Sequence, residues 1–104
     1  SSYRPSIFGD LAGNPKTPSW ILNEVFVEKE EVFGPSGLNN LFAENPATPL
    51  DLLTKIAATK DPEILTAILQ NPHCDCALTR NIKSLNSAGE IFTLAVQKEG
   101  ELCH

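Results

Sequence analysis

The sequence is poor in basic residues and has no long hydrophobic stretch. Its 104 residues include 8 Lys and Arg against 13 Asp and Glu, which gives a formal net charge of -5. Proteins that bind the phosphate backbone use clustered Lys and Arg, so this balance argues against nucleic-acid binding as the main function. No apolar run is long enough to span a bilayer, and no signal peptide stands at the start. We therefore expect no association with a membrane.

The residue patterns that carry catalysis are also missing. The sequence has 2 histidines, and neither lies near a Ser or Asp in a nucleophile motif. It contains no glycine-rich loop of the kind that holds phosphates. The acidic residues are scattered along predicted helices, which is typical of a solvated face. We therefore predict a protein without enzymatic activity and without a cofactor.

Cysteine is scarce and its number is odd. The 3 cysteines are Cys74, Cys76 and Cys103. Cys74 and Cys76 are separated by a single residue, which is too close for an ordinary structural disulfide. An odd count also fits a reducing compartment better than a secreted disulfide framework. We predict free thiols and a cytoplasmic protein.

The length and composition fit a single domain. Hydrophobic residues make up 41% of the chain and charged residues 20%. This composition suits a small globular domain with a modest core and does not suit a disordered tail. We assign residues 1–104 to one domain.

Three Asn-Pro pairs divide the chain into internal repeats. From Asn14, Asn45 and Asn71 the sequence reads NPKTPSWILNEV, NPATPLDLLTKI and NPHCDCALTRNI. Apolar residues recur at the eighth and twelfth positions, which share one helix face. A second apolar pair lies seven and three residues before each Asn. Each repeat is therefore predicted to form two short helical segments joined by an Asn-Pro corner, and such repeats indicate an α-solenoid.

Thr, Asp and Asn residues beside proline predict the helix ends. In Thr17-Pro18 and Thr48-Pro49 the Thr hydroxyl can cap a free backbone N–H, and Pro suits the first helical position. Asp61-Pro62 follows the same logic for the next segment. A residue that precedes Pro is pushed out of the α region, so we expect each Asn of an Asn-Pro pair to end the helix before it.

The C-terminal part predicts one more helix. Ser87 and Glu90 form a capping-box pattern before an apolar run. We predict a helix over about residues 88–98, with Gly100 as its stop. The three repeats before it cover about residues 7–31, 38–61 and 62–84.

The N-P-x-T-P-x-x-h-L pattern, together with the upstream apolar pair, resembles the leucine-rich repeat variant family. The resemblance covers residues 7 to about 82, but Cys74 and Asp75 replace the Thr and Pro in the third copy. It implies a right-handed α-solenoid without strands, in which α-helices that start at Thr-Pro alternate with short 3₁₀ or α segments. It also implies no shared catalytic chemistry and a role in binding other macromolecules.

An insertion lengthens the first repeat. The segment VFVEKEEVFGPSG, residues 25–37, is interpreted as an extension of the first α-helix that ends in a loop at 34–37. Insertions in solenoids fall on one face, which is often the binding face. The predicted core comprises Ile7, Leu11, Ile21, Leu22, Val25, Leu38, Phe42, Leu52, Leu53, Ile56, Ile64, Ile68, Leu78 and Ile82.

Three aromatic residues of the first repeat are the predicted contacts for a partner: Trp20, Phe26 and Phe33. Exposed aromatic residues favour interfaces. Phe26 and Phe33 form an apolar cluster with Val27 and Val32 around a charged run. The alternative is that this cluster folds back over the first repeat, since a terminal repeat needs covering. Trp20 could equally be a half-buried core residue.

Five residues carry the donor atoms of a zinc site, namely His73, Cys74, Cys76, Cys103 and His104. Their spacing argues against such a site, because C-x-C is not the usual knuckle. The repeat alignment gives a simpler interpretation, in which Cys74 occupies the position of the capping Thr. We predict no metal. A reactive thiol at Cys74 or Cys76, activated by a helix N-terminus, remains an alternative.

The leading prediction is a non-enzymatic helical-repeat module that binds another protein on a preformed, nearly rigid surface. Whether the module belongs to a larger protein is left open, as is its oligomeric state. One alternative is a nucleic-acid-binding repeat, with a basic edge made of Lys55, Lys60, Arg80 and Lys83. The other is the thiol or metal site at the two cysteines of the third repeat.

Overall fold

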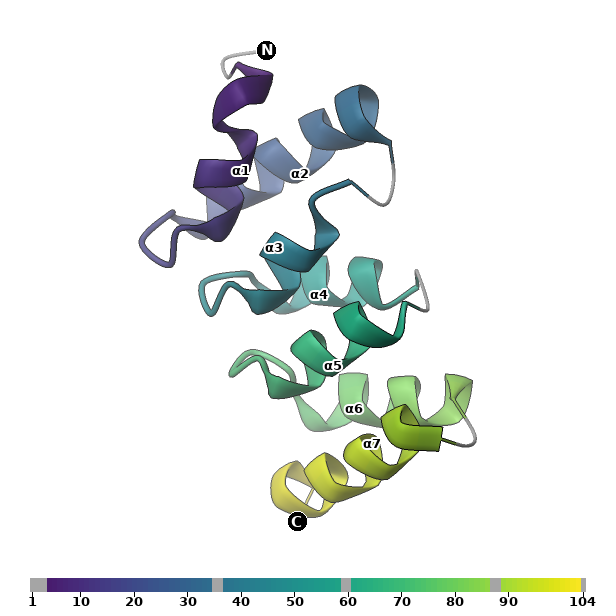
Figure 1. Cartoon of the computed structure of the whole chain (residues 1–104). Coiled ribbons are helices and arrows are strands. Elements are labelled where there is room, and N and C mark those ends of the chain that lie inside the picture. The colour runs from purple at the N-terminus through teal and green to yellow at the C-terminus, as the bar shows by residue number, and fades with distance from the viewer. Residues whose placement is uncertain (1–3, 35–36, 59–60, 87–88, 104) are drawn as a thin grey trace.

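The helices alternate between two layers along the chain. The computed structural model describes residues 4–34, 37–58, 61–86 and 89–103, and within these ranges it contains seven α-helices and no strand. The odd-numbered helices form one row and the even-numbered helices lie behind it, with the two chain ends at opposite ends of the molecule (Figure 1). The predicted all-α class is confirmed.

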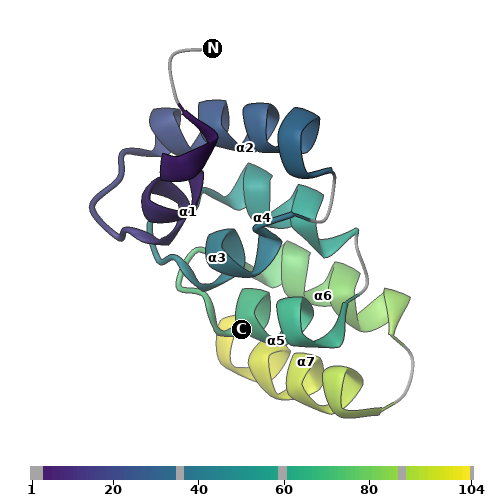
Figure 2. The ribbon, with the colours of Figure 1, turned by 45° about the horizontal axis from the view of Figure 1, so that its top comes forward.

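The row of odd-numbered helices consists of α1 (Pro5–Gly13), α3 (Asn39–Glu44), α5 (Pro62–Gln70) and α7 (Gly89–Leu102). The other layer consists of α2 (Ser19–Phe33), α4 (Leu50–Ala57) and α6 (Cys76–Leu85). Within the first row each helix packs against the next, and α6 packs against α7. The layers are also apparent in Figure 2 after a rotation of 45°.

An Asn-Pro corner ends each of the first three odd-numbered helices. Asn14, Asn45 and Asn71 stand directly after α1, α3 and α5, each with an extended backbone. Extended backbone is the conformation that a following Pro imposes, so the predicted helix ends are confirmed. In α7 the equivalent position is Lys98, which no Pro follows, and the helix continues through Gly100 to Leu102. The predicted stop at Gly100 is therefore wrong, and Ser87 lies outside the described residues.

The Thr residues of the Thr-Pro pairs do not cap the helices that follow them. Pro18 and Pro49 occupy the N-cap positions of α2 and α4, and no side chain makes a cap hydrogen bond there. The Thr48 hydroxyl instead donates to the Phe42 carbonyl at 2.6 Å. Thr48 and Thr17 are both buried. The predicted Thr caps are wrong, because the Thr48 hydroxyl points back to the end of the preceding helix and closes the corner.

Aspartate provides the side-chain caps that the Thr residues do not. The Asp61 carboxylate accepts from the Glu63 backbone N–H at 3.0 Å, as predicted for the start of α5. In the third copy, Asp75 stands where the other copies have Pro, and its carboxylate accepts from the Leu78 N–H at 2.8 Å. Asp75, where the third copy departs from the repeat pattern, therefore gives α6 a side-chain cap that α2 and α4 lack.

The short segments before each corner are α-helical. The Leu65 N–H donates to the Asp61 carbonyl at 2.8 Å, and the Phe42 N–H donates to the Leu38 carbonyl at 3.3 Å. Both bonds span four residues, which is the α-helical spacing. The 3₁₀ segments implied by the family resemblance are not present in the described part of α1, α3 or α5.

The insertion lengthens α2, as predicted. This helix has 15 residues, whereas α4 has 8 and α6 has 10. It is followed by Gly34 as the C-cap, whose φ of 83° is in the left-handed region that glycine adopts without a steric penalty. Pro35 and Ser36, which belong to the predicted loop, lie outside the described residues.

The hydrophobic core runs between the two layers. Ten predicted core residues are buried there: Leu22, Val25, Phe42, Leu52, Leu53, Ile56, Ile64, Ile68, Leu78 and Ile82. Leu11, Ile21 and Leu38 are only partly buried, and Ile7 is exposed. Several other residues are buried that the repeat pattern did not predict, including Phe8, Ala12, Ala43, Leu65, Leu69, Ile91 and Ala95. Among the described helices, none combines the length and apolarity needed to cross a membrane.

Candidate functional site

Trp20, near the start of α2, is the most exposed of the aromatic residues that the structure describes. Its side chain is 61% exposed, and Val27 is 59% exposed. Residues seven apart on a helix lie on the same face, so Trp20 and Val27 form one apolar strip, which we call the α2 strip. Large apolar side chains rimmed by polar residues are typical of protein-binding surfaces.

The repeat alignment explains why the α2 strip faces outward. Asp51 and Ala77 occupy the position of Trp20 in the second and third repeats, and both are exposed. Ala58 and Ser84 occupy the position of Val27, and they are exposed too. The α2 strip therefore lies on a surface that is open in every helix pair. The α2 strip is therefore not exposed merely because the first repeat lies at the end of the molecule.

Phe26, the second predicted contact residue, is part of the core. It is 4% exposed, and its ring meets the Phe42 ring edge-on with the centroids 5.3 Å apart. A buried side chain cannot contribute to a preformed surface, so Phe26 is removed from the candidate site. Its physical role is to join the first helix pair to α3.

The charged run of the insertion contains a buried lysine that sequence reasoning missed. Lys29 is fully buried, and its Nζ lies 4.5 Å from the centroid of the Phe26 ring. The ammonium donates to Asn39 Oδ1 at 2.6 Å. Burial lowers the pKa of Lys29, and the nearby Glu30 carboxylate partly opposes this shift. Lys29 thus ties the extended end of α2 to the start of α3.

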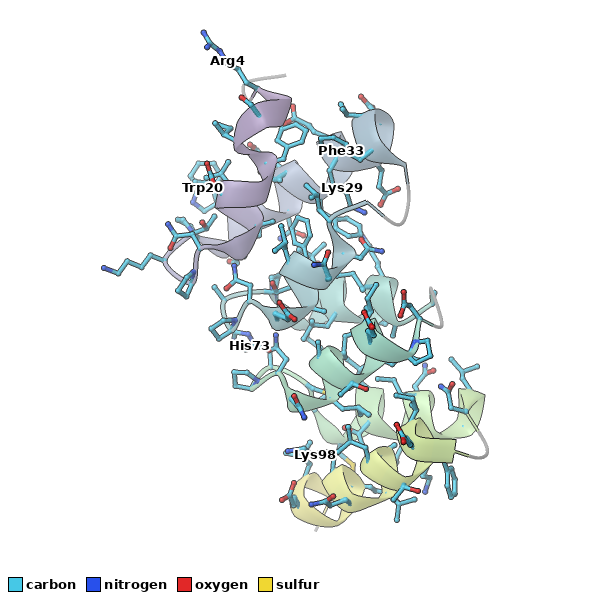
Figure 3. All side chains as sticks on the ribbon, in the orientation of Figure 1. Arg4, Trp20, Lys29, Phe33, His73 and Lys98 are labelled. Atoms are coloured by element: carbon cyan, nitrogen blue, oxygen red, sulfur yellow. A yellow bond between two sulfur atoms is a disulfide. The ribbon has the colours of Figure 1, made fainter. Side chains whose placement is uncertain are left out.

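Phe33, the third predicted contact residue, lies far from Trp20. Thirteen residues of helix separate the two by about 20 Å along the axis, and Figure 3 shows them at opposite ends of the first helix pair. Phe33 is half-exposed and packs edge-on against Phe8 with the ring centroids 6.1 Å apart. Phe33 therefore covers α1 in part, as the alternative for the insertion expected.

The Asn corners form a ladder of hydrogen bonds between successive repeats. Asn45 Nδ2 donates to the carbonyls of Ala12 at 2.8 Å and Asn14 at 3.0 Å. Asn71 Nδ2 donates to the carbonyls of Ala43 and Asn45, both at 2.9 Å. Each amide thus binds the C-terminal end of the helix one repeat earlier, and we call this arrangement the Asn ladder.

The same Asn residues also order their own corners. The Oδ1 atoms of Asn14, Asn45 and Asn71 each accept from the backbone N–H two residues later, at 2.9 Å. Asn commonly makes such a local bond in turns. The bond to the preceding repeat was not predicted. Its sequence signal is the recurrence of Asn, where a purely local turn would also accept Asp.

Two of the cysteines are joined, which corrects the prediction of free thiols. Cys76, at the start of α6, forms a disulfide with Cys103, which follows α7 and lies 27 residues away in the sequence. Sequence spacing correctly excluded a bond between Cys74 and Cys76 but could not show that the turn from α6 into α7 brings Cys103 back. The pairing removes the argument for a reducing compartment that rested on three unpaired cysteines.

Cys74 is buried, and it is not activated. Its Sγ lies 3.4 Å from Thr79 Oγ1. Burial raises the pKa of the Cys74 thiol, against a smaller opposing effect of the Thr79 hydrogen bond. A reactive thiolate needs a lowered pKa and access to solvent, so the reactive-thiol alternative does not fit Cys74.

Three of the five candidate zinc donors are engaged in other contacts. His73 Nδ1 lies 2.8 Å from the Thr48 carbonyl, and the disulfide occupies Cys76 and Cys103. Within the described ranges, no group of three His, Cys, Asp or Glu residues is arranged to hold a metal ion. His104 lies outside these ranges.

Two residues of the predicted basic edge share one carboxylate. Glu99 on α7 contacts Lys83 at 2.7 Å and Arg80 at 3.2 Å, both on α6. The hydrogen bond from Lys83 is the main cause that lowers the pKa of Glu99, and Arg80 adds to it. Lys60 lies outside the described residues. The Arg80 and Lys83 charges are thus used to hold α7 on α6.

Comparison with known proteins identified no relative: no family model, no curated protein and no solved structure matches the chain.

Proposed function

We propose that this chain is a non-enzymatic α-solenoid of the leucine-rich repeat variant type, and that its α2 strip binds another protein. The repeated Asn-Pro corners, each with the same local hydrogen bond, support the repeat assignment. The observation that carries the binding role is the exposure of Trp20 together with Val27 on one helix face. Trp is among the residues most enriched at the energetic centres of protein interfaces.

The surroundings of the α2 strip support binding without rearrangement. α2 is anchored along its length by the buried side chains of Leu22, Val25, Phe26 and Lys29. A surface on a helix that is already ordered loses little conformational entropy when it binds. We propose that the partner packs an apolar side chain or helix face against Trp20 and Val27.

A pair of matched variants tests this proposal. The folded chain, with a Trp20→Ala/Val27→Ala double variant beside it, serves as bait for proteins from the source cells after nuclease treatment. We expect a near-stoichiometric protein to bind the parent and its affinity to fall at least tenfold in the variant, since truncating an interface Trp commonly costs about 2 kcal/mol. The affinity is then measured by isothermal titration calorimetry with the purified protein.

The control removes exposed apolar side chains from the other end of the molecule. Leu85 on α6 and Val96 on α7 are also exposed, so a Leu85→Ala/Val96→Ala variant is expected to bind like the parent. Circular dichroism should be unchanged in both variants. Full affinity in the Trp20→Ala/Val27→Ala variant, or binding that disappears with nuclease, would refute the proposal.

A further inference from the structure

The N-terminal end of the molecule exposes apolar residues whose equivalents are more deeply buried in later repeats. Ile7 on α1 is 37% exposed. Of its equivalents in the later repeats, Leu38 is partly buried, and Ile64 and Ile91 are only 7% and 9% exposed. Leu11 is partly buried, whereas its equivalents Phe42 and Ile68 are fully buried. Elsewhere in the chain these positions pack against a preceding helix pair. In the first repeat they have no such neighbour among the described residues.

The second helix of the first repeat follows the same trend. Ile21 on α2 is partly buried, whereas Leu52 and Leu78, at the same position in α4 and α6, are buried. This surface differs from the α2 strip, because the positions of Trp20 and Val27 are exposed in all three repeats. We call the face formed by Ile7, Leu11 and Ile21 the N-terminal face.

Asn14 also differs from the equivalent Asn residues of the later repeats, in its exposure and in its hydrogen bonds. Its Oδ1 makes the local bond to the Lys16 N–H at 2.9 Å, as the other corners do. Asn45 and Asn71 are buried and each use Nδ2 to bind two carbonyls of the repeat before them. Asn14 is exposed, and among the described residues its Nδ2 has no hydrogen-bond partner.

We propose that the N-terminal face binds a further helix pair of the same repeat type, with Asn14 Nδ2 as the next rung of the Asn ladder. The two interfaces inside the chain define this partner, because they present the same chemistry twice. Its first helix ends in an Ala-x-Asn-Pro corner, as α1 and α3 do, and offers the carbonyls of that Ala and Asn. Its apolar side chains cover Ile7, Leu11 and Ile21.

The C-terminal end of a second copy does not present this chemistry. In α7, Lys98 stands at the ladder position, and the helix continues four residues beyond it to Leu102. The carbonyls of residues that precede the last turn of a helix already accept intrahelical bonds. A head-to-tail contact between copies would therefore lack the two free carbonyls that an Asn amide binds elsewhere in the chain.

The test adds a helix pair to the chain and asks whether Asn14 becomes a buried rung. A copy of residues 38–60 is joined directly to Arg4, because Arg4-Pro5 begins α1 as Asp61-Pro62 begins α5. A second fusion carries a short Gly-Ser linker at the junction, so that a strained junction does not decide the result. Thermal unfolding is followed for the parent and for both fusions.

The diagnostic substitution is Asn14→Asp, which keeps the local acceptor oxygen but replaces the Nδ2 donor by a second acceptor. In the parent we expect a shift of the melting temperature smaller than about 2 °C, as for other exposed sites. In a fusion with a docked helix pair, the carboxylate faces two carbonyls, and we expect the melting temperature to fall by about 10 °C or more. Asn45→Asp in the parent is the positive control and should cause a similar loss.

Three results would overturn the proposal. One is an Asn14→Asp effect that is equally small in the parent and in both fusions. Another is rapid hydrogen exchange throughout the added helix pair. The third is concentration-dependent self-association of the parent that Asn14→Asp abolishes in sedimentation velocity, since a second copy would then be the occupant. The proposal does not rest on the α2 strip, so Trp20→Ala should leave all these results unchanged.

Discussion

At the scale of single residues, the corners between the helices are held by side chains that each perform two tasks. Asn45 uses Oδ1 to order its own corner and Nδ2 to bind the repeat before it. Thr48 is fully buried and returns its hydroxyl to the carbonyl of Phe42. Buried backbone carbonyls are costly when they lack a donor. These polar side chains therefore contribute stability as well as local geometry.

Replacing Thr48 by Val should destabilise the fold although the shapes of the two side chains match. The substitution removes the 2.6 Å hydrogen bond to the Phe42 carbonyl. That carbonyl then keeps a longer bond, from the Asn45 N–H at 3.3 Å. We expect a loss of about 1–2 kcal/mol in the free energy of unfolding, measured by urea denaturation.

Thr54→Val is the matched control for that experiment. The Thr54 hydroxyl also donates to a carbonyl, that of Leu50 at 2.8 Å, but the residue is exposed on α4. Water can replace this bond, so the change should stay within about 0.5 kcal/mol. Equal effects of the two substitutions would show that the buried corner bond has no special role.

At the scale of helices, α7 differs from the other members of its row. It lacks an Asn-Pro corner and runs over 14 residues. Its last turns are joined to α6 by the Cys76–Cys103 disulfide and by the contacts of Glu99 with Arg80 and Lys83. A helix at the end of a row has a neighbour in that row on one side only. The disulfide and the Glu99 contacts hold this end helix on α6.

Breaking the disulfide should lower the stability of the whole chain. The bond closes a loop between residues 27 apart, and the chain-entropy model gives a loss of about 3.5 kcal/mol when a loop of this length is opened. We expect Cys103→Ser to reduce the unfolding free energy by that amount. Dithiothreitol should bring the parent to the level of the variant and leave the variant unchanged.

A thiol count provides an independent check on the disulfide. The structure describes one free cysteine, Cys74, which is buried. Titration with a thiol reagent in denaturant should therefore detect one thiol per parent chain and two per Cys103→Ser chain. A parent that titrates as three thiols, with a stability that dithiothreitol does not change, would contradict the pairing.

At the scale of the whole molecule, the elongated shape separates the two ends of the chain. The principal extents are 41 × 23 × 16 Å, and the helices of one row pack against their immediate neighbours. Substitutions far apart in such an arrangement share no contacting residues. Their effects on stability are expected to add, whereas those of contacting residues do not.

Two double variants should separate distant from neighbouring positions. Val25 on α2 and Ile82 on α6 are both fully buried, and the effects of Val25→Ala and Ile82→Val should sum to within about 0.5 kcal/mol. Phe26→Leu and Phe42→Leu remove rings that touch, and they should deviate from additivity by more than that. Additive behaviour in the contacting pair would contradict the edge-on contact.

The repeat pattern predicted most of the helices because their ends depend on local rules. Pro after Asn forces an extended backbone, and Asp61 before Pro62 caps α5. The predicted caps at Thr17 and Thr48 were wrong. The Thr48 hydroxyl bonds to the end of the preceding helix, and local sequence does not distinguish between the two nearby helix ends. Of the residues predicted to contact a partner, Trp20 is exposed, whereas Phe26 belongs to the core.

The sequence by itself determined the all-α class, the Asn-Pro corners and the long α2, because each follows from backbone preferences within a few residues. The tertiary structure decided the features that depend on distant parts of the chain. It brings Cys103 to Cys76, buries Lys29 beside Asn39 and directs Asn45 and Asn71 to carbonyls of the preceding repeat. It also leaves Asn14 and Ile7 exposed, since no described helix precedes α1 in its row.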